Sequence, residues 1–137
     1  MNEEGSFQRI GKSEQHMYGP RGLVICGMST DEQQAVYSLV QNGGVPSLPV
    51  IAVTDDMQDR TMAEVLGLPD RHGFGGTSSS RRAVVMSGFT EMELHWLMSA
   101  YRRLDLPRPL WATLTPTSEV WSVRQLVSEL AAEDDSM

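Results

Sequence analysis

Short apolar runs alternate along this chain with longer stretches in which apolar residues recur at every third or fourth position. Short runs rich in valine and isoleucine are typical of strands buried on both faces, whereas the longer spacing is typical of one face of a helix. The pattern therefore predicts an α/β fold in which strands and helices alternate. The predicted strands are residues 22–27, 50–54, 83–86 and 110–115.

Each predicted helix begins with the sequence of a capping box, in which a serine or threonine is followed three residues later by glutamate or glutamine. The hydroxyl accepts a backbone N–H of the first turn, and the longer side chain returns to the backbone of the cap residue. One such motif comes after each of the four apolar runs, so each run is expected to lead into a helix. The pairs are Ser29/Glu32, Thr61/Glu64, Thr90/Glu93 and Ser122/Gln125.

The chain contains one unit twice, at a constant offset of 61 residues. The offset pairs the turn that begins at Gly27 with the turn that begins at Gly88, and it continues through both helix starts. A fixed internal period indicates a duplicated structure. We therefore predict two β-α-β-α repeats, residues 22–68 and 83–132, which form one compact domain with a four-stranded sheet, flanking helices and an approximate internal two-fold axis.

Two segments lie outside the predicted repeats. Residues 1–21 show no apolar periodicity and are expected to form an N-terminal arm. Residues 69–82 are rich in glycine and serine and are expected to be a flexible linker, although their hydroxyls and Arg81-Arg82 could instead wrap an anion. Because a linker of this length allows either direction for the second repeat, the sequence leaves open an all-parallel or a mixed sheet.

Three features of the second repeat carry a resemblance to a known family. They are the turn Gly88-Phe89-Thr90, the proline-flanked strand within residues 107–117, and the helix start Trp121-Ser122, six residues after Thr115. Over about residues 83–132 these features resemble the bacterial family catalogued as domain of unknown function 3783. The family has no assigned activity, so the resemblance implies a domain and no mechanism.

Composition and charge narrow the classes of function. The net charge of −7 repels phosphate backbones, so nucleic-acid binding is not expected. Cys26 is the single cysteine, which leaves neither a disulfide framework nor a cysteine-based zinc site. The first residues lack the pattern of a signal peptide, and no apolar run approaches the ~20 residues of a membrane span. A cytoplasmic protein without a membrane partner or cofactor is expected.

The first functional hypothesis is a non-catalytic module for protein interaction or homodimerisation. The first predicted helix of the second repeat has a stripe of Met92, Trp96 and Ala100 beside its main apolar stripe. A surface helix needs one apolar stripe, so a second stripe predicts a second partner, and tryptophan and methionine are enriched where proteins meet. The alternative is that the helix of the first repeat covers this stripe inside the monomer.

The second hypothesis is a regulatory domain that binds a small ligand or a metal ion at the carboxyl ends of its strands. Open α/β sheets hold ligands there, and grouped carboxylates suit hard cations. The predicted ligand-binding residues are Thr54, Asp55, Asp56, Thr115 and Thr117, with the metal unknown. None of the nucleophile, zinc or phosphate-loop motifs is present, so no catalytic residue is predicted and the sequence makes no case for an enzyme.

Overall fold

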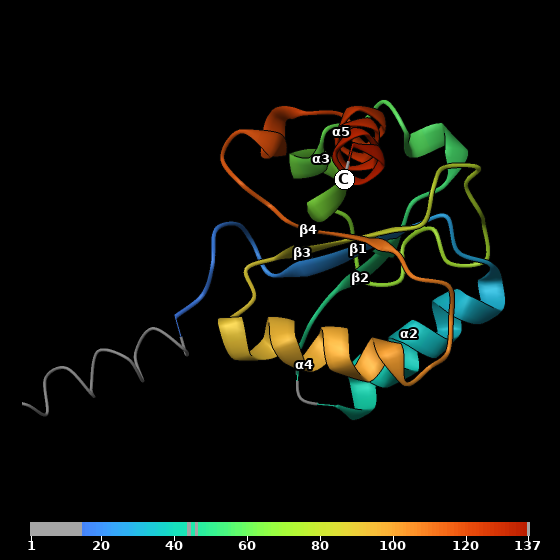
Figure 1. Cartoon of the computed structure of the whole chain (residues 1–137), viewed down its shortest axis with the longest axis vertical. Helices are drawn as coiled ribbons and strands as arrows, with labels where there is room; N and C mark the ends of the chain where they lie inside the picture. Colours follow the sequence, from blue (N-terminus) through green and yellow to red (C-terminus); the bar gives the residue numbers. More distant parts are fainter. Residues whose placement is uncertain (1–14, 44, 46, 137) are drawn as a thin grey trace, which may run out of the picture.

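The computed structural model describes residues 15–43, 45 and 47–136, so most of the predicted N-terminal arm lies outside the described residues. A four-stranded sheet lies between two layers of helices, with α2 and α4 on one face and α3 and α5 on the other (Figure 1). The predicted α/β fold is confirmed. The elements are β1 (Gly22–Cys26), α2 (Thr30–Asn42), β2 (Val50–Ala52), η1 (Asp55–Met57), α3 (Met62–Leu66), β3 (Ala83–Ser87), α4 (Glu91–Arg102), β4 (Leu110–Thr113), η2 (Ser118–Val120) and α5 (Val123–Asp135).

The sheet is mixed, which settles the strand order that the sequence left open. Its order is β2-β1-β3-β4, with parallel pairing within each repeat and antiparallel pairing of β1 with β3 at the centre. The two repeats therefore run in opposite directions. As a consequence, the carboxyl ends of β2 and β4 lie at opposite ends of the sheet.

The strand register shows where the internal two-fold axis lies. In the central pair, Val24 lies opposite Val85, which is its own equivalent 61 positions later. The isolated bridge between Thr61 and Ser122 joins a second pair of equivalent residues. Antiparallel pairing of equivalent residues occurs only where a two-fold axis passes between them, so the axis runs through both contacts.

Hydrogen bonds near the axis are reciprocal in the same way. The amide of Met62 donates to the carbonyl of Trp121 over 2.9 Å, and the amide of Val123 donates to the carbonyl of Arg60 over 3.0 Å. The two bonds are equivalent, because the two donors, Met62 and Val123, are 61 positions apart. The two acceptors are 61 positions apart as well. The two repeats are therefore joined as a closed pair, with the geometry expected of a symmetric dimer.

Three of the four predicted capping boxes form completely. Ser29, Thr61 and Thr90 each accept the backbone N–H of the glutamate three residues on, and each glutamate returns to the cap backbone. The fourth is half formed, because Ser122 accepts from the amide of Gln125 while the Gln125 side chain makes no return bond to it. A neutral amide oxygen is a weaker acceptor than a carboxylate, which agrees with this difference.

The linker, residues 69–82, runs along the first repeat and makes specific contacts there. Tyr37 donates to Asp70 over 2.9 Å and packs edge-on against Phe74, and the Arg71 guanidinium lies 4.7 Å from the centre of the Tyr37 ring. The buried side chain of Gln33 accepts from the amide of Gly75 and donates to the carbonyl of Gly76. The flexibility of this segment stays a prediction, but its path is specified by these contacts.

Candidate functional site

The structure separates the predicted ligand-binding residues into two groups. Thr54, Asp55 and Asp56 come after β2, whereas Thr115 and Thr117 come after β4 at the opposite end of the sheet. The hypothesis of one shared site needed all strands to end together, and the antiparallel contact of β1 with β3 prevents that. Each group must therefore be considered by itself.

The group after β4 is occupied with its own turn. Thr115 donates to the hydroxyl of Ser118 over 3.1 Å, and its hydroxyl accepts the amide of Ser118 over 3.0 Å. These bonds close the turn into η2, while Thr117 is exposed. The polar groups of Thr115 satisfy the local backbone, so they offer little to a ligand.

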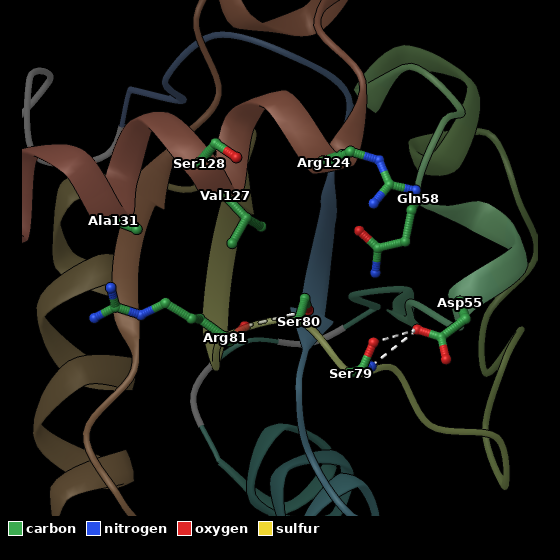
Figure 2. Close-up of a pocket in the computed structure, with 9 residues that line it drawn as sticks. All are labelled: Asp55, Gln58, Ser79, Ser80, Arg81, Arg124, Val127, Ser128 and Ala131. Atoms are coloured by element: carbon green, nitrogen blue, oxygen red, sulfur yellow. Dashed lines mark hydrogen bonds between the residues drawn. The ribbon is translucent and has the colours of Figure 1, made fainter.

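The group after β2 borders a pocket of about 520 Å³ (Figure 2). Asp55 accepts both the amide and the hydroxyl of Ser79, over 2.9 and 3.2 Å, and so fixes the linker at the rim. Asp56 instead accepts from Thr54, a hydrogen bond that lowers the pKa of the Asp56 carboxyl. The lining residues are Asp55, Gln58, Ser79, Ser80, Arg81, Arg124, Val127, Ser128 and Ala131.

Gln58 is the buried polar residue of this pocket. Its side chain is only 6% exposed, and its amide nitrogen has no hydrogen-bond partner among the described residues. Leaving a buried donor unpaired costs free energy, so an unpaired donor beside a cavity points to a missing partner. Arg124, on α5, lies beside Gln58, because its backbone amide donates to the backbone carbonyl of Gln58 over 2.9 Å, and both side chains line the pocket (Figure 2).

Sequence reasoning did not select Gln58 or Arg124, although a signal was available. Gln58 corresponds to Glu119 at the offset of 61, and Ser79 corresponds to Tyr18. Extending the offset into residues 15–21 and 76–82 shows where the two halves differ. The positions at which the two halves differ, rather than the capping boxes that they share, therefore indicate where this pocket lies.

No metal site is evident in the described part of the chain. There, no group of three or more histidine, cysteine, aspartate or glutamate side chains converges as ligands. Cys26 is buried, and burial raises the pKa of its thiol to about 12, so the thiol is neutral and unreactive at pH 7. Within the same residues, no helix has the length and apolar character needed to cross a membrane.

The predicted interaction stripe on α4 does not form one exposed surface. Met92 is 65% exposed, whereas Ala100 is fully buried beneath the helix. Trp96 is half-buried and packs against the core, with its ring against Gly43 at the end of α2. The first-repeat helix thus covers part of the stripe, as the alternative anticipated, and an interaction role for the exposed part stays a prediction.

The outer edge of β2 is covered by the linker. The carbonyl of Val50 accepts from the amide of Arg71 over 2.7 Å, and the amide of Ala52 donates to the carbonyl of His72 over 2.9 Å. The amide of Val50 donates to the carboxylate of Asp70 over 2.8 Å. This edge of the sheet therefore has its outward backbone groups satisfied.

The outer edge of β4 has no such cover among the described residues. Leu110 and Leu114 donate their amides toward β3, so by the two-residue alternation of a strand the backbone groups of Trp111 and Thr113 point outward. Neither residue has a backbone partner on that side within residues 15–43, 45 and 47–136. Trp111 and Thr113 are the equivalents of Val50 and Ala52, whose outward groups the linker satisfies.

The difference arises from the segment that comes after each strand. After β2 the chain forms the five-residue helix α3 and then returns along the strand, whereas after β4 it continues through the thirteen-residue helix α5. Positions equivalent to Asp70, Arg71 and His72 are thus part of a helix. One duplicated unit consequently has a closed sheet edge, and the other has an open one.

Comparison with known families gives a match over the second repeat. Residues 82–137 match the model of the family described as Domain of unknown function (DUF3783), which confirms the resemblance of the second repeat. Neither a curated protein nor a solved structure matches the chain.

Proposed function

We propose that this chain, whose residues 82–137 form a DUF3783 domain, is a non-catalytic interaction module that pairs with a second copy of itself through β4. The observation that carries the proposal is the difference between the two sheet edges. An edge strand with unsatisfied N–H and C=O groups is a template for another strand. The equivalent strand β2, whose outer backbone groups bond to the linker, is the internal control for the open edge of β4.

The outward groups of β4 are complementary to themselves. In an antiparallel pair of two β4 strands, Trp111 of one copy lies opposite Thr113 of the other, with Ala112 at the two-fold axis. Every outward donor of one copy then faces an outward acceptor of its partner. Such an arrangement is closed after two copies, which is the commonest symmetry of soluble assemblies.

The ends of β4 limit the pairing to its central residues. Pro109 precedes the strand and has no amide to donate, and the amide of Thr115 already donates to Ser118 over 3.0 Å. Between them, Leu110, Trp111 and Ala112 are partly exposed. Pairing would cover apolar side chains on both faces of the strand, which adds a hydrophobic contribution to the backbone bonds.

The test is the mass of the full chain in solution for wild type and Thr113→Pro, measured by light scattering after size exclusion. Proline removes an outward donor and leaves the bonds between β3 and β4 in place. We expect a dimer for wild type, a monomer for Thr113→Pro, and similar far-ultraviolet circular dichroism for both. The exposed residue Met92 supplies the comparison, since Met92→Glu should leave the dimer intact.

A wild-type monomer at high protein concentration would contradict the proposal, as would a dimer that survives Thr113→Pro. Dissociation by Met92→Glu alone would place the interface on α4. Amide hydrogen exchange gives an independent measurement that needs no variant. The amides of Trp111 and Thr113 should gain protection as the protein concentration rises, while the amide of Ala52, already bonded to His72, should not change.

A further inference from the structure

The segments that line the pocket in Figure 2 have equivalents at the other end of the sheet, related to them by the internal two-fold axis. Arg82 pairs with Glu32 over 3.0 Å, and the equivalent Arg21 pairs with Glu93 over 2.6 Å. The segment before β1 therefore lies against the second repeat as the end of the linker lies against the first.

The glycine turns confirm that the two places are equivalent. A Cβ atom on Gly27 would lie 2.6 Å from the carbonyl oxygen of Ser80, and a Cβ atom on Gly88 would lie 2.8 Å from the carbonyl oxygen of Gly19. Both glycines have positive φ angles, of 70° and 69°. Ser80 and Gly19 are 61 positions apart, so the backbone takes the same path at both ends.

At the second-repeat end the side chain of Tyr18, which is 44% exposed, lies over this place. The hydroxyl of Tyr18 donates to the carboxylate of Glu119 over 2.6 Å, and this hydrogen bond raises the pKa of the Tyr18 phenol. At the first-repeat end, Ser79 stands where Tyr18 would be and turns to Asp55. No aromatic ring stands at this position of the first repeat, and the cavity lies open beside the unpaired amide of Gln58.

Four residues around the cavity differ from their counterparts in one direction, whereas Asp55, whose counterpart is Pro116, differs in the other. An acid is replaced by a neutral amide, and two cationic side chains and a hydroxyl are added. On balance the pocket therefore has more hydrogen-bond donors and more positive charge than the place beside Tyr18 and Glu119. The equivalent positions, pocket first, are Gln58/Glu119, Ser80/Gly19, Arg81/Pro20 and Arg124/Ala63.

We infer that this pocket binds a small aromatic carboxylate, whose ring takes the place of the missing tyrosine ring and whose carboxylate accepts from Gln58 and Arg124. In the second repeat the Tyr18 hydroxyl is the donor and the Glu119 carboxylate is the acceptor. In the first repeat the side-chain amide of Gln58 is the donor, so the bound ligand must supply the acceptor. The inference is independent of pairing through β4.

The two arginines of the pocket, Arg124 and Arg81, differ in which of their nitrogens already have an acidic partner. Arg124 donates its Nε to Asp59 over 3.0 Å, which leaves its two terminal nitrogens for a carboxylate. Arg81 has its terminal nitrogens near Asp134 and Asp135 and contributes to the rim. Val127 and Ala131 give the ring an apolar wall.

Asp55 sets the orientation of the ligand. One of its oxygens accepts from Ser79, and its charge repels a carboxylate from that side of the pocket. The anionic group should therefore lie toward Gln58 and Arg124, with the ring between them and the linker. A hydroxyl on the far side of the ring could donate to Asp55, so 4-hydroxybenzoate should bind more tightly than benzoate.

The experiment is a titration of the isotope-labelled full chain with benzoate, monitored by amide and side-chain NMR shifts. Saturable shifts should appear at the side-chain amide of Gln58 and at residues 79–81. Gln58→Glu places a carboxylate against the anion and should weaken binding about tenfold or more, and Ser79→Tyr, which restores the missing ring, should abolish it. Tyr18→Phe, at the equivalent end, should leave benzoate affinity unchanged.

Benzamide tests whether the charge is recognised, because it keeps the ring and loses the anion. It should bind at least about tenfold more weakly than benzoate. Equal binding of the two would overturn the inference, as would no saturable shift with benzoate, or shifts that Gln58→Glu and Ser79→Tyr both leave unchanged. Gln58→Glu adds no bulk, so it remains informative if Ser79→Tyr does not fold.

Discussion

At the scale of single residues, Glu32 and Glu93 each connect a helix start to the other repeat. Each carboxylate accepts the backbone N–H of its own N-cap residue and also an arginine guanidinium from the segment that precedes the opposite central strand. The hydrogen bond from Arg82 lowers the pKa of Glu32. Burial acts to raise the pKa of Glu93, but the bonds from Arg21 and Thr90 outweigh it and lower that pKa as well.

These lowered pKa values predict how stability depends on pH. A carboxyl whose pKa is lower in the folded than in the unfolded state stabilises the fold above its unfolded pKa, and the contribution is lost as the pH falls through the folded value. Below about pH 4.5, the ordinary value for glutamate, wild type should therefore lose stability more steeply than Glu32→Gln/Glu93→Gln. At pH 7 each single glutamine variant should lower the free energy of unfolding by about 1 kcal/mol.

Urea unfolding at a series of pH values would measure both effects. The matched control is Glu91→Gln, which removes an exposed acid from the first turn of α4. It should leave the pH dependence close to that of wild type. Parallel curves for wild type and the double glutamine variant would contradict the assignment of acid sensitivity to these two carboxyls.

At the scale of elements, the linker determines which sheet edge is open. Its Asp70 accepts from the amide of Val50 and from the hydroxyl of Tyr37, and the next two residues bond the rest of β2. These contacts have no equivalent beside β4, since the corresponding positions belong to α5. A segment that composition identifies as a tether therefore acts as a cover for an edge strand.

Removing the Asp70 carboxylate should weaken this cover. Asp70→Ala leaves the amide of Val50 unsatisfied and should lower the free energy of unfolding by about 1 kcal/mol, whereas Asp70→Asn keeps an acceptor oxygen and should cost less. Denaturant unfolding compares the two variants. Hydrogen exchange should also become faster at Val50 in Asp70→Ala, and equal behaviour of both variants would show that the carboxylate does not protect the edge.

The sequence predicted the helices, the strands and the repeats, but not how these elements pack against one another. The constant offset and the capping motifs predicted the repeats, because both are visible in the order of residues along the chain. The direction of β3 against β1 depends on contacts that form only in the folded state, so the sequence could not show that the predicted ligand-binding residues after β2 and after β4 lie at opposite ends of the sheet. The partial burial of Trp96 has the same origin, since its ring packs against Gly43 at the end of α2.

At the scale of the whole molecule, duplication left two similar halves with different surfaces. The shared framework is visible in the register, where Leu23 with Val50 and Val84 with Trp111 are equivalent pairs. The differences lie in the segments that join and extend the units. One half has a covered edge and an open pocket, whereas the other has an open edge and, at the place equivalent to the pocket, the Tyr18–Glu119 hydrogen bond. The two proposals therefore place one partner on each half.

The overall charge predicts how salt should affect pairing through β4. Each chain carries a net charge of −7, so two copies repel one another as they approach. Salt screens that repulsion, since the Debye length falls from about 10 Å at 0.1 M to about 3 Å at 1 M. The backbone bonds and apolar contacts of the proposed interface do not depend on exposed ion pairs. Dimerisation should therefore strengthen as salt is added.

Sedimentation equilibrium of wild type at low and high sodium chloride would measure the change, and Thr113→Pro gives the control because it should stay monomeric at both. If the dimer instead weakened as salt was added, opposite charges would be holding the copies together. The open edge of β4, bordered by the backbone groups of Trp111 and Thr113, would then not be the contact that decides association.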